Sequence, residues 1–173
     1  MAAMEWSEKL VLGLAPMDQT HVEFVDAYNR LLNVSGAELL AEMDVFIAHT
    51  VEHFDQENRW MEQIGFPACH KAEHDRVLAV CQDVRKRMER GDAALGRQLI
   101  RELPVWFDNH VATMDAALSS YIESIGFDTE TGEILRPQED DCADGASSCC
   151  TPPASSGEST CGAPASAADS QPA

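Results

Sequence analysis

Apolar side chains recur at alternating steps of four and three along four stretches of the sequence. The stretches run from about residue 18 to 33, 37 to 64, 68 to 90 and 93 to 124. This spacing predicts amphipathic helices, and strand-type alternation is hard to find. Turns that contain glycine separate the stretches, and short connections favour antiparallel neighbours. The sequence therefore predicts an all-α fold, an up-down-up-down antiparallel four-helix bundle.

The fourth stretch contains a helix breaker. Pro104 lacks a backbone N–H, so it predicts a kink or a new helix start at that point. The positions expected to face the core in this stretch are Leu99, Leu103, Trp106, His110, Met114 and Ala117.

The sequence changes character after Phe127. Residues 128–173 contain no aromatic side chain and are rich in Ala, Ser, Pro and acidic residues. Burial of so little apolar surface cannot offset the entropy of ordering, so we expect a disordered tail after a bundle domain at residues 1–127. The tail cysteines match no zinc motif, which leaves soft-metal binding, a labile disulfide, partner anchoring or no role. They are Cys142, Cys149, Cys150 and Cys161.

The charge of the chain excludes several classes of partner. It carries 30 acidic and 12 basic residues, a formal net charge of −18. Nucleic acid and anionic membrane surfaces should repel such a chain, and no apolar run has the roughly 20 residues that cross a bilayer. The first residues lack the basic and apolar segments of a secretory signal. We expect a cytoplasmic protein with reduced thiols that binds no nucleic acid and does not insert into membranes.

Polar residues interrupt the predicted core-facing positions of all four helices. An unpaired buried polar group costs about 1–3 kcal/mol, so these residues need partners. His53 and Glu57 are four residues apart, as are His70 and His74, so each pair lies on one face of a helix. The full set is His21, His53, Glu57, His70, His74 and His110.

Imidazoles and carboxylates together suit iron, zinc or manganese. Five histidines are more than one metal ion normally takes from a protein, so two metal ions are the more natural prediction. Asp115 lies five residues after His110, about 140° around an ideal α-helix. It would join the cluster only through a local widening of the helix or a long reach, and the spacing alone does not select it.

The order of these residues resembles that of the hemerythrin family, in its bacterial single-domain type. The similarity covers about residues 4–127 and includes the opening Trp6-Ser-Glu-Lys-Leu and the run Met17-Asp18-Gln-Thr-His21. The segments that carry it are His21, then His53-Phe-Asp-Gln-Glu57, then His70-Lys-Ala-Glu-His74, then His110-Val-Ala-Thr-Met-Asp115. The resemblance implies a non-haem di-iron centre that binds O2 reversibly.

The same resemblance implies a role for each residue of the set. One iron would have three histidine ligands: His70, His74 and His110. The other would have two, His21 and His53, and an open position for O2. Glu57 and Asp115 would bridge the two irons, together with an oxo or hydroxo group. An apolar wall around the open position would exclude water and anions, and its members would be Phe24, Phe54, Trp106 and Val111.

Two further residues near the cluster carry weaker expectations. Asn58 stands where many relatives have a second Glu, and we expect it to face outward. His49 lies four residues before His53, and surface placement is favoured over contact with that residue.

The function that the resemblance implies is O2 transport, storage or delivery, without enzymatic turnover. The partners would be O2 and a reductase or an O2-consuming enzyme. The alternatives are a sensor of O2, nitric oxide or redox state, an enzyme that consumes peroxide or nitric oxide, and an iron-handling protein. Ferritin-like sites contain more carboxylates, in Glu-x-x-His spacing, so the five histidines argue against iron handling.

Overall fold

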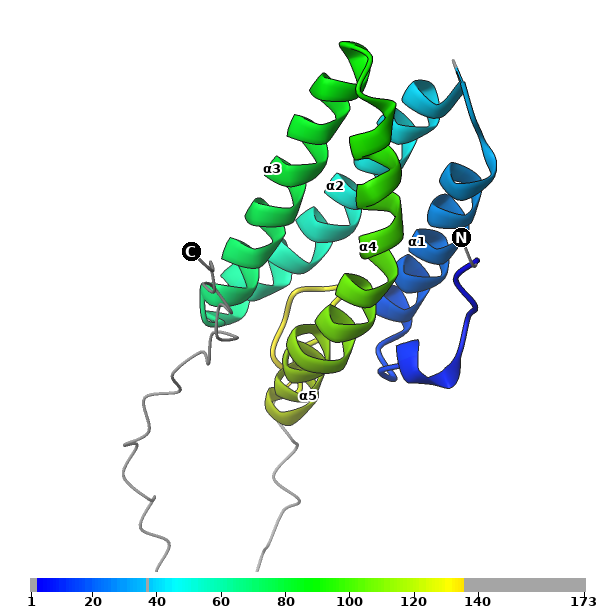
Figure 1. Cartoon of the computed structure of the whole chain (residues 1–173). Helices are drawn as coiled ribbons and strands as arrows, with labels where there is room; N and C mark the ends of the chain where they lie inside the picture. The colour runs from blue at the N-terminus through cyan, green and yellow to red at the C-terminus, as the bar shows by residue number, and fades with distance from the viewer. Residues whose placement is uncertain (1–2, 37, 136–173) are drawn as a thin grey trace, which may run out of the picture. The chain divides into compact units, whose positions relative to one another are not determined.

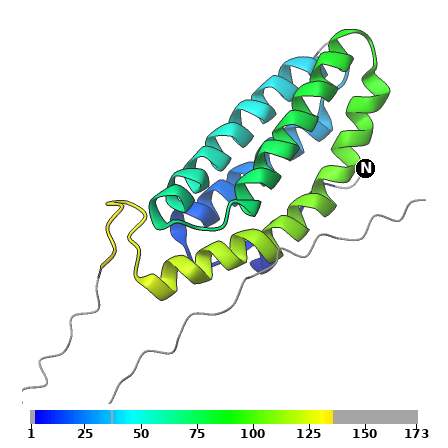
Figure 2. The same ribbon diagram turned by 90° about the vertical axis from the view of Figure 1, so that its left-hand side faces the viewer.

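The structure is a computed structural model that describes residues 3–36 and 38–135. Figures 1 and 2 show α1, α2, α3 and a fourth rod, in which α4 continues through η2 into α5, side by side. Consecutive helices contact each other, and α1 also contacts α4. The prediction of an all-α four-helix bundle is confirmed. The elements are η1 (Glu8–Leu10), α1 (Ala15–Asn33), α2 (Glu38–Ile64), α3 (Cys69–Glu89), α4 (Ala93–His110), η2 (Val111–Asp115) and α5 (Ala116–Ile125).

The arm before α1 is attached to the first turn of that helix. Both carboxylate oxygens of Asp18 accept backbone hydrogen bonds, from the N–H of Leu12 at 2.7 Å and of Gly13 at 3.1 Å. The hydroxyl of Ser119 in α5 donates to the carbonyl of Leu12 at 3.1 Å. These bonds hold η1 against the bundle, with Leu10 buried.

The core-facing positions predicted for the first three helices are all buried. In the fourth rod, Trp106 and Met114 are only half-buried and Ala117 is exposed. Beyond His110 the buried positions are shifted by one residue because the π-helical segment η2 adds a residue to one turn. The positions that the spacing predicts to face the core in these three helices, all of them buried, are Met17, His21, Phe24, Tyr28, Leu31, Leu39, Met43, Phe46, Thr50, His53, Glu57, Trp60, His70, His74, Val77, Cys81, Val84 and Met88.

Pro104 does not interrupt the fourth rod. It lies inside α4, so the alternative of a new helix start is wrong. A proline removes one donor from the helix ladder and bends a helix. Figure 2 shows the fourth rod curving along its length.

The chain beyond Phe127 folds back against the end of α5. The N–H of Leu135 donates to the carbonyl of Gly126 at 2.8 Å, and Phe127 and Ile134 form an isolated antiparallel bridge. The indole of Trp60 in α2 donates to the carbonyl of Thr129 at 3.3 Å. Residues 128–135, which the sequence predicts to be disordered, therefore form a hydrogen-bonded turn. The rest of the predicted tail, including its four cysteines, lies outside the described residues.

A local signal explains why this turn forms. Asp128 Oδ1 accepts hydrogen bonds from the backbone N–H groups of Glu130 at 2.8 Å and Thr131 at 3.2 Å. An aspartate that bonds the backbone two and three residues ahead is a common turn former. The segment is poor in apolar residues, and a prediction from composition alone therefore misses the turn.

Gly126 joins α5 to this turn, and we predict that its replacement by alanine is strongly destabilising. Its φ is +63°, and an added Cβ would lie 2.6 Å from the carbonyl oxygen of Leu135. The left-handed backbone alone costs an alanine about 1–2 kcal/mol. Urea unfolding should show that Gly126→Ala loses about 2 kcal/mol or more, because the clash adds to that cost.

Gly65→Ala is the matched control for this prediction. Gly65 has a φ of +66°, but a Cβ added there would have no neighbouring atom within 4 Å, so only the backbone cost applies. Equal losses of stability in the two variants would show that the turn at residues 128–135 does not pack against Gly126.

Two other expectations concern membranes and thiols. Among the described residues, no helix has the length and apolarity needed to cross a membrane. Cys81 carries a free, buried thiol, and burial raises its pKa to about 11. Cys69 is disulfide-bonded, so the expectation of reduced thiols is wrong at this position.

Candidate metal centre

Five histidines and two carboxylates from all four rods meet in the interior of the bundle. Each of the seven side chains is buried, and the most exposed of them, His110, has 4% of its surface accessible. The seven are His21 from α1, His53 and Glu57 from α2, His70 and His74 from α3, His110 from α4 and Asp115 from η2.

Three of the histidines form one group with both carboxylates. His110 Nε2 lies 3.2 Å from His70 Nε2 and 3.0 Å from His74 Nε2. Asp115 Oδ1 is 3.0 Å from His70 Nε2, and Glu57 Oε2 is 3.4 Å from the same atom. One potential ligand atom from each of the five residues lies within 4.8 Å of the others, which is the spacing of a site that can hold a metal ion.

The remaining two histidines form a second group around the other carboxylate oxygens. His53 Nε2 lies 3.0 Å from Glu57 Oε1, and His21 Nε2 lies 3.2 Å from Asp115 Oδ2. The rings of His21 and His53 have their centroids 5.5 Å apart. Each carboxylate therefore presents one oxygen to the three-histidine group and the other oxygen to the two-histidine group.

The π-helical segment explains how Asp115 joins the cluster. In an α-helix, residues five apart do not share a face, but the wider π turn brings them together. Residues 111–115 form such a turn directly after His110, and Asp115 Oδ1 lies 3.1 Å from His110 Nε2. The structure thus has the local widening that the spacing of these two residues requires.

Two of the histidines are oriented by hydrogen bonds on their outer nitrogens. His21 Nδ1 donates to the backbone carbonyl of Leu10 in η1 at 2.9 Å. His74 Nδ1 donates to Asn58 Oδ1 at 3.1 Å. Each bond leaves the lone pair on Nε2, which points into the cluster. Asn58 is therefore half-buried against a cluster residue, and the expectation that it faces outward is wrong.

The cluster contains buried polar atoms that lie close to other ring nitrogens or carboxylate oxygens but have no hydrogen-bond partner among the described residues. They include His21 Nε2, Glu57 Oε2 and both carboxylate oxygens of Asp115. A buried polar atom without a partner loses its hydration and gains nothing in return. These atoms point toward the two groups, as is expected of ligands whose partners are cations, so the residues fit a pair of metal ions.

Burial sets the protonation of the cluster. It lowers the pKa of His53 to about 3 and that of His74 to about 2, so both rings are neutral and able to donate a lone pair. Burial, and then the charge of Asp115, raise the pKa of Glu57 well above its usual value. Burial also opposes ionisation of Asp115, but the close ring nitrogens of His110, His21 and His70, 3.0–3.2 Å from its carboxylate oxygens, outweigh it and hold the pKa of Asp115 well below its usual range.

These pKa directions predict that the metal-free protein loses stability in mild acid. His53 and His74 stay neutral when folded but take up protons when unfolded below about pH 6.5. Each of these histidines makes its full contribution to the free energy of unfolding above that pH. Below it, each contribution falls by about 1.4 kcal/mol per pH unit. Glu57 opposes one of these losses down to about pH 4.5, because its folded pKa is raised.

Burial also lowers the pKa of His49, which adds to the loss, so between pH 6.5 and 4.5 the free energy of unfolding should fall by at least about 1.4 kcal/mol per pH unit. Urea unfolding of the chelator-treated protein at pH 6.5, 5.5 and 4.5 measures it. A free energy of unfolding that is constant or rises as the pH falls would contradict the neutral state of the two histidines.

Aromatic side chains pack on both histidine groups. Phe54 stacks on His74 with ring centroids 3.9 Å apart and an angle of 3° between the planes. Trp106 stacks on His110 at 4.8 Å and 23°. Phe54 also lies 5.5 Å from the ring of His53. Of the four residues predicted to surround the open position, Trp106 thus contacts the three-histidine group, and Phe54 contacts both groups.

A different pair of phenylalanines packs on the two-histidine group. Phe24, which the sequence singles out, meets His53 edge-on at 6.3 Å, and Phe107 meets His21 edge-on at 5.6 Å. The two phenylalanine rings stack on each other at 4.0 Å and 10°. Phe107 was not predicted, although it lies four residues after the buried Leu103 and continues its face of the helix.

Val111 and His49 are the last two residues that the sequence predicted near the cluster. The fourth predicted wall residue, Val111, is fully buried. The ring of His49 lies 6.3 Å from that of His53, and 17% of its side chain is exposed. His49 is therefore largely buried beside His53, which is the less favoured of its two expected placements.

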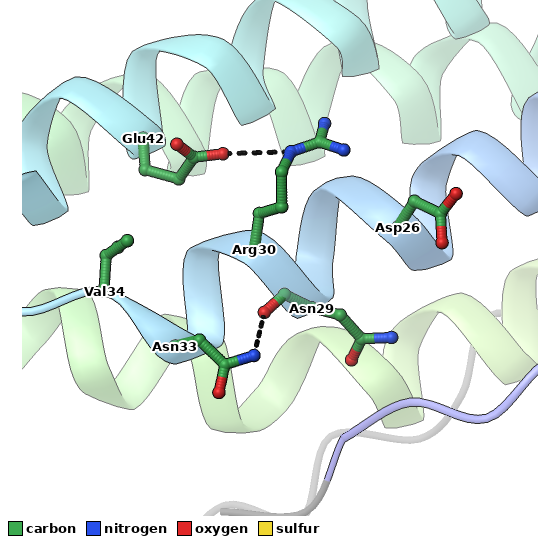
Figure 3. Close-up of a pocket in the computed structure, with 6 residues that line it drawn as sticks. All are labelled: Asp26, Asn29, Arg30, Asn33, Val34 and Glu42. Atoms are coloured by element: carbon green, nitrogen blue, oxygen red, sulfur yellow. Dashed lines mark hydrogen bonds and ion pairs between the residues drawn. The ribbon is translucent and has the colours of Figure 1, made fainter.

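A surface depression between α1 and α2 is separate from this centre. In Figure 3, Arg30 Nε donates to Glu42 Oε1 at 3.2 Å, and Asn33 Nδ2 donates to the carbonyl of Asn29 at 2.7 Å. Arg30 and Glu42 thus bond to each other in this depression, whereas the side chain of Asn29 bonds to the backbone of Met4. The depression is lined by Asp26, Asn29, Arg30, Asn33, Val34 and Glu42, and none of the seven cluster residues lines it.

Comparison with known proteins decides the family. The model of the family described as "Hemerythrin HHE cation binding domain" matches residues 12–122, which include all seven cluster residues. The chain belongs to the hemerythrin family. The resemblance read from the sequence is thereby confirmed, and the hemerythrin match spans the helices that build the cluster.

Curated proteins of the same family are similar over most of this chain. A bacteriohemerythrin of Ralstonia nicotianae is 45% identical over 130 residues, 74% of this chain and 95% of that protein. The bacteriohemerythrin of Methylococcus capsulatus is 30% identical over 66% of this chain and 93% of that protein. That of Pseudomonas aeruginosa is 28% identical over 72% and 83% of the two chains. No solved structure matches this chain.

Proposed function

We propose that this chain holds two iron ions and uses them to bind O2 reversibly, as a carrier or store. The observation that carries the proposal is the division of the two carboxylates. Glu57 and Asp115 each present one oxygen to the three-histidine group and one to the two-histidine group. A carboxylate shared in this way bridges two metal ions, and the donor set of imidazole and carboxylate suits iron. The similar proteins named bacteriohemerythrin support the choice of iron and O2.

In this proposal the two ions have different numbers of protein ligands. One would be held by His70, His74 and His110, the other by His21 and His53, with Glu57 and Asp115 bridging. The ion with two histidines has one protein ligand fewer, which leaves room for a small molecule. A pair of ferrous ions supplies the electrons that bind O2 without consuming a substrate.

The surrounding residues would keep water away from the two-histidine group. Phe24 and Val111 have no accessible surface, and Phe107 and Phe54 have about 1% each. A dry, apolar surrounding limits the access of water and anions that would promote irreversible oxidation of the iron.

The test is reconstitution of the full chain with ferrous iron under argon, followed by O2 addition and removal. The proposal expects two irons per chain and a visible absorption that appears with O2 and disappears under argon. Fewer than two irons per chain, or no change of colour with O2, would overturn it. Prompt irreversible oxidation, with steady consumption of an added reductant, would replace it with an enzymatic function.

A further inference from the structure

Asn58 contacts one of the proposed ligands, His74, through a side-chain hydrogen bond. It follows Glu57 on α2, so its side chain leaves the helix about 100° further round, toward α3. Its Oδ1 accepts the hydrogen bond from His74 Nδ1 at 3.1 Å. By contrast, the Nδ1 atoms of His53, His70 and His110 are buried without a partner among the described residues. Among the described residues, a side chain therefore binds the outer nitrogen of His74 but not that of His70 or His110.

Stacking alone does not decide which atoms of the His74 ring face the centre. The ring lies parallel to Phe54 at 3.9 Å, and that contact holds its plane. A half-turn of the ring about its Cβ–Cγ bond preserves the stack but turns Nε2 away from His110 and Glu57. In the structure it is the carbonyl oxygen of Asn58 that faces the ring, and because an oxygen can only accept a hydrogen bond, this arrangement requires the orientation and the tautomer with the proton on Nδ1.

The second property of Asn58 is its lack of charge. The centre already contains two buried carboxylates within a few ångströms of each other. A carboxylate in place of the amide would draw the His74 proton more strongly, and it would add negative charge beside the metal position. Both changes stabilise a more positive metal ion. A neutral acceptor orients His74 without that effect.

We propose that Asn58 is a positioning residue that holds His74 with its proton on Nδ1 and, being neutral, favours the reduced, O2-binding form of the centre. The first half concerns the chain alone. The second half rests on the proposed function, because it needs iron at the centre.

The first half is tested on the metal-free chain by long-range ¹H–¹⁵N NMR, which reports which ring nitrogen carries the proton. His74 should have its proton on Nδ1 in the wild type and in Asn58→Asp, which keeps the acceptor. In Asn58→Leu, which removes it, we expect a mixture of tautomers. A wild-type proton on Nε2, or an unchanged His74 signal in Asn58→Leu, would overturn the assignment whether or not iron binds.

The second half is tested by redox titration of the iron-loaded full chain. Asn58→Asp should shift the equilibrium toward the ferric form at least tenfold, which corresponds to a midpoint potential lower by 59 mV for a one-electron step. Asn33→Asp is the matched control, since it adds the same charge at an exposed position of α1, twelve residues and about 18 Å along the helix from His21. It should shift the equilibrium less than twofold.

The outcomes separate the two proposals. Equal shifts in Asn58→Asp and Asn33→Asp would overturn the role of the neutral amide while leaving the proposed function intact. A wild-type chain that binds no iron would overturn the proposed function and the second half with it, and the NMR measurement would still decide the first half.

Discussion

Replacement of His74 by alanine will leave the chain with far fewer than two irons and a bundle that unfolds more easily. His74 is fully buried, and its Nε2 lies 3.0 Å from His110 Nε2 and 3.6 Å from Glu57 Oε2. Its loss removes one proposed ligand and leaves a cavity beside Phe54. We expect the metal-free protein to lose about 2–4 kcal/mol of stability, from the cavity and the unpaired polar groups. Iron analysis and urea unfolding measure the two effects.

His49→Ala is the matched control, because it removes the same side chain from a neighbouring site. The ring of His49 lies against that of His53, but His49 belongs to neither of the two groups that can hold a metal ion. This variant should keep two irons per chain. It should lose less stability than His74→Ala because 17% of the side chain is exposed. Equal iron loss in the two variants would contradict the proposed ligands.

Replacement of either shared carboxylate by its amide should reduce the iron content from two per chain to one or fewer. An amide has one acceptor oxygen, and its other terminal atom is a donor, so it cannot present an oxygen to both groups. Glu57→Gln and Asp115→Asn both make this change with almost no change in size. Iron analysis of the reconstituted chains measures it, with Glu62→Gln, an exposed position on the same helix as Glu57, as the control that keeps both irons.

The same two variants should differ in the stability of the metal-free protein. Burial and Asp115 raise the pKa of Glu57, so its charged form is unfavourable and Glu57→Gln should leave stability unchanged or higher. Asp115 has its pKa held well below its usual range by three histidines, so Asp115→Asn should lower stability. Urea unfolding near pH 7 measures the stabilities of the two metal-free variants.

The iron analysis has its own contradicting outcome. Two irons per chain in both amide variants would show that the carboxylates do not bridge.

Features that depend on the periodicity of one helix were predictable from the sequence. The core faces of α1, α2 and α3 follow from spacing alone, as do the pairs His53–Glu57 and His70–His74. Residues four apart share a helix face whatever surrounds the helix. A face on which most side chains are apolar is the buried face, so a polar residue on that face is buried as well.

Features that depend on a change of helix geometry were not predictable in this way. Asp115 joins the cluster because η2 is a π turn, and the same turn moves the buried face of α5 by one residue. A π turn has no strong sequence signal, because packing against the other helices stabilises it rather than local propensity. The turn at residues 128–135 was also missed, since its composition resembles that of a disordered segment.

The order of residues along this chain thus determined that four amphipathic helices would form and that five histidines and Glu57 would point inward. The resemblance to the hemerythrin family already included Asp115, but only the tertiary structure showed how its side chain reaches the other six. The tertiary structure alone decided that Asn58 binds His74 and that Phe107 packs on His21. The physical reason is that a helix face is set by bonds within about four residues, whereas a contact between helices depends on how each rod is rotated and packed.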